Sequence, residues 1–334
     1  MLEGGTVTTS KYSAPGSPGT SQVSLCVRWF AAIVALSMPA VAAAEPATKV
    51  YLNGRPAPVY FNDGDSFRVL GGPYVGTKAR LAGFNTLESY GNVHQWGTWT
   101  AAELYRNAKM GTLNARQGVW HCTSDLKRDG YGRILWWCPD LAEDQIRKGF
   151  AHAMTVTDAP SEPFLIRAQR LAQQERRGMW AHGVPDYVLT STHSNNEGYE
   201  GKTYNRLVST RDGHSKKWYH LDIYKECDNV CSKTVRYDDE KLRASLATLR
   251  ADPNLSSFIG RYSDGQLLDL ARAKLVGERL AGLLDVAHKA PLEAAFTTLQ
   301  QSGALGQAAE QSDSCMIYAP FNRRYGARSA SCLH

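Results

Sequence analysis

The segment from Val119 to Cys138 constrains the fold of this chain more than any other stretch, because it has the pattern of a disulfide-closed β-hairpin. A polar turn, KRDGYGR at 127–133, separates two runs of β-branched and aromatic residues, which is typical of two strands joined by a short connection. Cys122 and Cys138 each lie eight positions from Gly130. A hairpin centred on Gly130 places them directly opposite, about 5 Å apart, and predicts the disulfide Cys122–Cys138.

The amino terminus has the pattern of an export signal. Arg28 precedes an apolar run from Phe30 to Val41, and the small residues Ala42–Ala44 form a cleavage site. The run is about a dozen residues long, too short for a helix that spans a bilayer, so no stable membrane span is expected. We therefore predict that residues 1–44 are a leader and that the mature protein is secreted or periplasmic in a bacterium. A membrane anchor is the alternative.

Six of the seven cysteines follow this leader, and an even number in an exported chain favours disulfides over free thiols. Beyond the hairpin, we predict that neighbours in the sequence pair, as Cys227–Cys231 and Cys315–Cys332. The alternative for the first pair is a zinc site, with His214 and His220 upstream as further ligands. The loose spacing and the oxidising compartment favour the disulfide.

Residues 49–190 alternate short strand-like runs with turns and then turn helical. Strands are expected over 58–84 and in the hairpin, and helices near 100–114, 140–149 and 161–177. Thr100 with Glu103, and Asp140 with Glu143, have the spacing of helix caps and are expected to start the first two helices. This order predicts an α+β fold with a small OB-type barrel of five strands and three helices. A polar stretch, 191–202, is predicted to be a linker. The remainder, 203–334, is predicted to be a second, mixed and helix-rich domain of unknown role. Within it, Ser263 and Gln266 have capping-box spacing and are expected to start a helix that reaches about His288.

Four short motifs occur in one order along the first domain. They are Asp63-Gly64-Asp65, the segment Arg80–Glu88, the turn Asp129–Arg133, and the segment Arg147–Ala151. In this order, and followed by the helix that runs into Trp180, they resemble the staphylococcal nuclease (thermonuclease) family. That family has a DGD turn, an R-x-x-x-x-D-T-P-E segment, a Y-G-R turn and a helix ending in R-x-G-L/F-A. The resemblance covers about 130 residues.

The resemblance implies phosphodiester hydrolysis assisted by Ca²⁺, which takes hard oxygen ligands. Carried over residue by residue, it makes Asp65 the main Ca²⁺ ligand, joined by the Asn85 side-chain oxygen and the Thr86 backbone carbonyl. It makes Glu88 the general base or the carboxylate that positions water. Arg80 and Arg133 match the two phosphate-clamping arginines, and Tyr131 matches a residue that contacts the substrate phosphate.

The sequence departs from the family pattern at several positions. Asn85 stands where the family has aspartate, so one negative charge is missing and weaker metal binding is expected. Leu87 replaces the usual proline. Thr155 and Thr157 stand where the staphylococcal protein has tyrosines near the bound base. Base stacking is therefore expected to be reduced, and base preference cannot be carried over.

The formal net charge of +6 is a mild excess that favours a polyanionic partner without requiring one. Lys127 and Arg128, at the hairpin turn, are predicted to contact the nucleic-acid backbone, with a solvated hairpin tip as the alternative. The leading hypothesis is an exported Ca²⁺-dependent endonuclease that acts on DNA, with RNA as a second candidate substrate. The rival is a non-catalytic OB-type module that binds nucleic acid or protein at the cell surface. The sequence gives no indication of oligomeric state.

Overall fold

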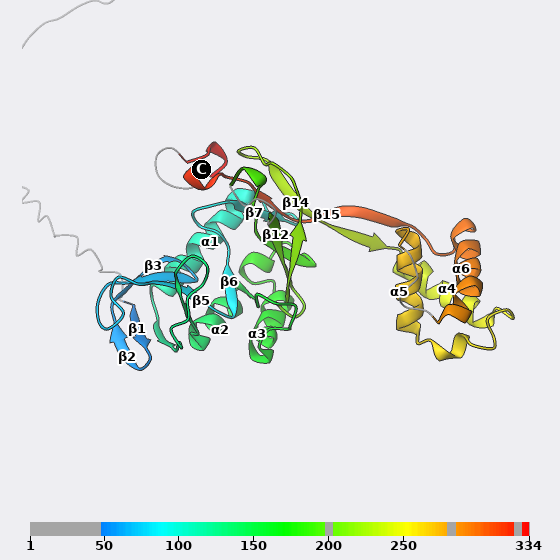
Figure 1. The fold of residues 1–334 in the computed structure, drawn as a ribbon, viewed down its shortest axis with the longest axis horizontal. Coiled ribbons are helices and arrows are strands. Elements are labelled where there is room, and N and C mark those ends of the chain that lie inside the picture. The colour runs from blue at the N-terminus through cyan, green and yellow to red at the C-terminus, as the bar shows by residue number, and fades with distance from the viewer. Residues whose placement is uncertain (1–47, 198–202, 279–284, 324–328, 334) are drawn as a thin grey trace, which may run out of the picture. The chain divides into compact units, whose positions relative to one another are not determined.

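The computed structural model describes residues 48–197, 203–278, 285–323 and 329–333, and the predicted leader lies outside them (Figure 1). The chain folds into a mixed α+β structure. A four-stranded sheet has the order β3–β4–β5–β9, in which β9 joins β5 in parallel and the other pairs are antiparallel. Its strands are β3 (Val59–Asp63), β4 (Ser66–Val69), β5 (Lys78–Leu81) and β9 (Ile134–Trp136).

Two smaller sheets complete the first region. One has the order β2–β1–β8, and the other pairs β6 with β10 antiparallel. Their strands are β1 (Lys49–Leu52), β2 (Arg55–Ala57), β6 (Phe84–Thr86), β8 (Val119–Cys122) and β10 (Ala151–Ala153). The described strands do not close into a barrel. The structure thus shows the α+β class that the sequence predicts, without the closed ring of an OB-type barrel.

Three helices pack against these strands, as the sequence predicts. They are α1 (Ala101–Ala115), α2 (Pro139–Arg147) and α3 (Pro163–Gln174). Thr100 and Glu103 form the expected capping box at the start of α1. Helix α2 begins one residue earlier than the expected cap at Asp140, because Pro139 occupies its first turn, where no N–H is needed. The core between strands and helices includes Phe67 and Trp136, both fully buried.

The second region shares a sheet with the first. Strand β7 (Val93–Trp96) pairs with β15 (Ala308–Ile317), which in turn pairs with β14 (Asn229–Tyr237) (Figure 1). A further antiparallel sheet has the order β11–β12–β13. Its strands are β11 (Tyr187–Ser191), β12 (Tyr204–Ser209) and β13 (Ser215–Tyr219). The predicted boundary near residue 190 therefore falls inside β11, and residues from both sides of it form common sheets.

Helices α4 (Asp239–Ala251), α5 (Asp264–Leu275) and α6 (Val286–Gln301) have a hydrophobic core of their own. Ser263 and Gln266 form the predicted capping box of α5. That helix was expected to reach His288, but it ends at Leu275, and Gly277 follows with a φ of +73°. Short 3₁₀ turns lie at Gly178–Trp180, Asn195–Glu197, Ile259–Arg261, Phe321–Arg323 and Ser331–Leu333. Among the described helices, none is long and apolar enough to cross a membrane.

The hairpin disulfide Cys122–Cys138 is present as predicted, with a Cα–Cα distance of 4.2 Å. The two cysteines flank the antiparallel bridge between Thr123 and Trp137, which places them opposite each other. The strands on either side, β8 and β9, pair mainly with β1 and β5 rather than with one another. The turn therefore determines which cysteines face each other, whereas β1 and β5 determine the sheets that β8 and β9 join.

The other two predicted disulfides were wrong. The structure has Cys231–Cys315 and Cys227–Cys332 in place of Cys227–Cys231 and Cys315–Cys332. Cys231 and Cys315 are direct partners in the β14–β15 register, with a Cα–Cα distance of 4.0 Å. Strand pairing, and not nearness in sequence, determines the partner. The zinc alternative also fails at these positions, because both cysteines are oxidised and cannot supply thiolates.

Candidate active site

The turn between β3 and β4 carries the first candidate ligand. The Asp63 Oδ1 accepts hydrogen bonds from the Ser66 hydroxyl (2.7 Å) and from the Asp65 backbone N–H (3.3 Å), which fixes the turn. Asp65 is 2% exposed, and its Oδ2 accepts from the Thr86 backbone N–H at 2.8 Å. A Cβ added to Gly64 would lie 2.5 Å from the Thr86 Cγ2. The DGD turn thus packs closely on β6, and only glycine fits at its centre.

Arg80 joins this turn to β6. Arg80 pairs with Ser66 in the β4–β5 register, which brings the Arg80 side chain beside Asp65. The guanidinium donates to the Asp65 Oδ1 and to the Asn85 Oδ1. The Asn85 Nδ2 donates to the Thr86 carbonyl at 2.8 Å. Together with the Asp65–Thr86 hydrogen bond, these contacts form a closed ring of four residues, which we call the Asp65–Arg80 ring.

Burial and neighbouring charges shift the acid–base behaviour of this site. Burial, then Asp65, then Glu88 raise the pKa of the Asp63 carboxyl to about 8, against the lowering effect of Ser66 and Arg80. Burial lowers the pKa of Arg80, but Asp65, Asp63, Glu88 and Asp129 together raise it above its usual value. Acidic side chains from three separate motifs therefore act on one guanidinium, which remains charged.

The charge of Glu88 acts on Asp63 and Arg80, and a histidine on β7 holds the Glu88 backbone. The Glu88 N–H donates to the Nε2 of His94 at 3.1 Å. His94 is buried on β7, and burial, followed by the nearby His152, lowers its pKa to about 3. His94 is thus a neutral imidazole that accepts at Nε2 and carries its proton on Nδ1. Since β7 pairs with β15, the carboxy-terminal region supports the segment that carries Glu88.

Arg133 lies in the hairpin turn, where it contacts Asp129 and Tyr131. Its Nε and Nη2 each lie 2.7 Å from the Asp129 Oδ2, and its guanidinium lies 5.3 Å from the centroid of the Tyr131 ring. Burial raises the pKa of Asp129, but hydrogen bonds from Arg133 hold it below its usual value. Asp129 also acts on Arg80 electrostatically. Arg80 pairs with Leu135 on β9, so the hairpin lies alongside the strand that carries Arg80.

The two predicted backbone-contacting cations lie at the hairpin tip, apart from this cluster. The Lys127 Nζ lies 2.6 Å from the Asp125 Oδ2, and the Arg128 Nη1 donates to the Gly132 carbonyl at 2.6 Å. Both side chains are exposed, and these contacts stay within the hairpin. The structure therefore brings Asp65, Arg80, Asn85 and Thr86 together by hydrogen bonds. Glu88 and Asp129 are near enough for their charges to raise the pKa of Arg80, and Asp129 in turn holds Arg133. Lys127 and Arg128 make their contacts within the hairpin.

Several residues of the site were not assigned a role from the sequence. Asp63 and Asp129 lie inside the quoted motifs, and their spacing of two and four residues from Asp65 and Arg133 was an available signal. Gln145 is fully buried, and its Nε2 donates to the carbonyls of Gly64 (3.3 Å) and Gly111 (2.8 Å), which supports the DGD turn from α2. Nothing in its local sequence distinguishes it from an ordinary helix residue.

The oxygens of the Asp65–Arg80 ring suit a hard cation. The Asp65 carboxylate, the Asn85 amide oxygen and the Thr86 carbonyl are of the donor type that Ca²⁺ prefers, and each has lone pairs beyond the hydrogen bond it accepts. Among the described residues, no group of three or more His, Cys, Asp or Glu side chains is placed to hold a metal. Of the three proposed ligands, only Asp65 is such a side chain, and the other two oxygens come from the Asn85 amide and the Thr86 backbone carbonyl.

No protein-family model and no curated protein matches the chain.

Proposed function

We propose that this protein is an exported, Ca²⁺-dependent nuclease that hydrolyses phosphodiester bonds in DNA, with RNA as the second candidate substrate, and that it has an OB-type catalytic region similar to that of the staphylococcal nuclease family. The observation that carries the proposal is the Asp65–Arg80 ring with Glu88 within electrostatic reach of Arg80. Three motifs that are separate in sequence supply a set of oxygen donors, a carboxylate and two guanidinium groups, which are the groups that phosphodiester hydrolysis requires.

In this proposal, Asp65, Asn85 and Thr86 hold the cation. Bound Ca²⁺ would supply positive charge beside the phosphorus and orient water. Glu88 accepts a proton from the attacking water as the new O–P bond forms and the bond from phosphorus to the 5′ oxygen breaks. That oxygen takes a proton from solvent water and leaves as a 5′ hydroxyl, a 3′-phosphate end remains, and Glu88 releases its proton to solvent.

Arg80 and Arg133 stabilise the charge that develops on the phosphate oxygens. A guanidinium has five N–H donors. Arg80 directs donors to Asp65 and Asn85, and Arg133 directs two to Asp129, so each keeps donors for a phosphate. Asp129 acts here as a positioning residue, since its carboxylate fixes the Arg133 guanidinium beside the ring of Tyr131.

The disulfides support the exported location. Three disulfides are typical of proteins from oxidising compartments such as the bacterial periplasm or the extracellular medium. Two of them tie β14 to β15 and the last described turn to the residues before β14, so oxidation stabilises the sheet that supports His94 and, through it, Glu88.

The rival function is a non-catalytic module that binds nucleic acid or protein. One observation favours it: the Arg80 guanidinium, itself a cation, donates to two of the oxygens proposed as Ca²⁺ ligands, those of Asp65 and Asn85. The two functions are distinguished by incubating the purified protein with supercoiled plasmid, in Ca²⁺ and in a chelator. Digestion only in Ca²⁺ is expected. Plasmid that stays intact but migrates more slowly in a gel under both conditions would reject the nuclease and support the binding module.

A further inference from the structure

The hairpin of β12 and β13 carries an ordered set of aromatic and basic side chains. In its register, Tyr204 pairs with Tyr219 and Arg206 pairs with Lys217. Side chains alternate between the faces of a strand, so these four lie on one face. The opposite face carries Leu207 and Trp218, which pack into a hydrophobic core. We call the first set, Tyr204, Arg206, Lys217 and Tyr219, the aromatic–basic face.

The four side chains contact one another around the Tyr204 ring. The Lys217 Nζ lies 4.7 Å from the ring centroid and the Arg206 Cζ lies 5.6 Å from it, both within the range of cation–π attraction. The centroids of Tyr204 and Tyr219 are 6.0 Å apart. Tyr219 is 65% exposed and Lys217 is exposed as well. The cluster is thus ordered by its own contacts and open to solvent.

Among the residues that the structure describes, no acidic side chain pairs with the two cations of this face. Like charges placed directly opposite on neighbouring strands repel each other, and Arg206 and Lys217 are such a pair. Arg206 donates to the Val156 carbonyl (3.3 Å) and to the Tyr204 hydroxyl (3.4 Å). Within the described ranges, neither cation takes part in an ion pair. An anion between the two would remove the repulsion.

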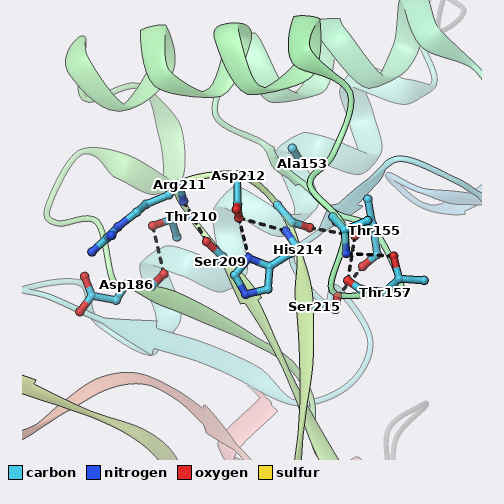
Figure 2. A network of polar contacts seen from close by, with 12 residues as sticks. Ala153, Thr155, Thr157, Asp186, Ser209, Thr210, Arg211, Asp212, His214 and Ser215 are labelled. Atoms are coloured by element: carbon cyan, nitrogen blue, oxygen red, sulfur yellow. Dashed lines mark hydrogen bonds and ion pairs between the residues drawn. The ribbon is translucent and has the colours of Figure 1, made fainter. Parts of the chain in front are cut away.

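Backbone hydrogen bonds fix this hairpin to the strand that leads to the candidate active site. The Thr155 N–H donates to the Gly213 carbonyl (2.8 Å) and the Ser215 N–H donates to the Thr157 carbonyl (2.7 Å); Figure 2 shows the hairpin tip against this segment. Just upstream, Ala151 on β10 pairs with Thr86. The five Cα–Cα steps from residue 151 to residue 156 span at most about 18 Å, so the aromatic–basic face lies within a few nucleotides of the Asp65–Arg80 ring.

We propose that the aromatic–basic face binds single-stranded nucleic acid, with a phosphate between Arg206 and Lys217 and a base stacked on Tyr219. Alternating cations and exposed rings match the chemistry of a single strand, whose bases are free to stack and whose phosphates carry charge. In a duplex the bases are already stacked on each other. The strand that this face holds is the substrate of the active site, and that link alone rests on the proposed function.

The test is fluorescence anisotropy with a short labelled oligothymidylate in the presence of a chelator, so that no cleavage occurs. Tyr219→Ala is expected to weaken binding at least about fivefold, and Tyr219→Phe to leave it unchanged, because stacking needs the ring and not the hydroxyl. Lys217→Gln is expected to reduce the slope of log affinity against log salt by about 0.7, the contribution of one phosphate contact to a single strand. Arg243→Ala, which removes an exposed charge on α4, is the control and should change neither quantity.

Wild-type affinity in Tyr219→Ala, at an unchanged thermal unfolding midpoint, would overturn the proposal. Equal affinity for the oligonucleotide, for duplex DNA and for heparin would do so as well, since it would show a general attraction for polyanions. A protein that leaves plasmid intact in Ca²⁺ yet shows these binding losses would refute the nuclease and retain the single-strand site. A protein that cleaves plasmid in Ca²⁺ but shows no binding losses in these variants would retain the nuclease and refute the single-strand site.

Discussion

Gly149 and Gly178 lie backbone against backbone, with no space for a side chain at either position. A Cβ on Gly149 would lie 2.3 Å from the Arg177 carbonyl oxygen, and a Cβ on Gly178 would lie 2.3 Å from the Gly149 carbonyl oxygen. The Met179 N–H donates to that same Gly149 oxygen at 2.8 Å. The end of α2 and the turn after α3 therefore meet at two glycines. This contact explains physically why glycine stands at both positions.

Gly178→Ala is expected to lower the free energy of unfolding by about 2–5 kcal/mol. Its φ of +49° is strained for alanine, and the new methyl group overlaps backbone atoms that cannot move aside. Urea unfolding followed by circular dichroism measures the change. Gly130→Ala is the matched control, because nothing lies within 4 Å of its added Cβ, and it should cost less than about 0.5 kcal/mol. Equal stability of the two variants would contradict the close contact.

Glu88→Gln is expected to lower the rate of plasmid cleavage by about 100-fold or more while leaving the unfolding midpoint nearly unchanged. The amide keeps the shape of the side chain but cannot accept the proton of the attacking water. Initial rates in saturating Ca²⁺ provide the measurement. Glu162→Gln removes an exposed carboxylate elsewhere in the same region and should cleave like wild type. Full activity in Glu88→Gln would reject Glu88 as the base.

Arg133→Ala is expected to reduce cleavage by about 100-fold or more, because it removes a forked donor that stabilises charge on the phosphate. The side chain is partly exposed and contacts chiefly Asp129 and Tyr131, so folding should be retained. Arg170→Ala, an exposed arginine on α3, controls for the loss of one positive charge. If both variants lose activity equally, general electrostatic attraction accounts for the effect and Arg133 has no special role.

Asn85→Asp is expected to lower the Ca²⁺ concentration needed for half-maximal cleavage. The substitution adds a negative charge at an oxygen that Arg80 already holds, and affinity for Ca²⁺ rises with the number of charged ligands. A Ca²⁺ titration of the cleavage rate, repeated with isothermal calorimetry in the absence of nucleic acid, measures both activity and binding. An unchanged requirement in both measurements would mean that Asn85 does not contact the cation.

Local patterns in the sequence predicted the features whose residues lie close together along the chain. The Cys122–Cys138 disulfide followed from the symmetry of one turn, and the capping boxes of α1 and α5 followed from residues three apart. The pairing of Cys231 with Cys315 did not, because it depends on a strand pair whose cysteines are 84 residues apart. Neighbouring cysteines offered a shorter loop, and nothing in the sequence revealed that β14 and β15 would align.

The candidate site shows the same division. The motifs placed Asp65, Arg80 and Asn85 in one cluster, since hairpin registers within about 25 residues bring them together. His94 gave no such signal, because it lies in a short alternating strand where a buried histidine looks like any core residue. Its contact with Glu88 requires β15, which comes more than 200 residues later in the chain, to hold β7 in place.

His94 leads to a prediction about pH. Its folded pKa of about 3 lies below the value of about 6.5 expected in the unfolded chain. The unfolded state therefore binds a proton first as pH falls. The stability that neutral His94 contributes is fully present above pH 6.5 and is lost as pH falls towards 3, at about 1.4 kcal/mol per pH unit. His94→Gln should remove this slope while its side-chain oxygen still accepts from Glu88.

The window between pH 6.5 and 5 suits this test, because carboxyl groups with ordinary pKa values titrate below it. Asp63, whose pKa is raised to about 8, is protonated in the folded state of both proteins across the window, so its contribution cancels in the difference. Urea unfolding across that window should show the wild type losing stability faster than His94→Gln. His152, whose pKa burial lowers to about 4, contributes the same slope to both proteins and cancels in the difference. Parallel stability curves would show that His94 accepts a proton in the folded state. Its Nε2 would then no longer accept from the Glu88 N–H, and cleavage would fall across the same window without any loss of stability.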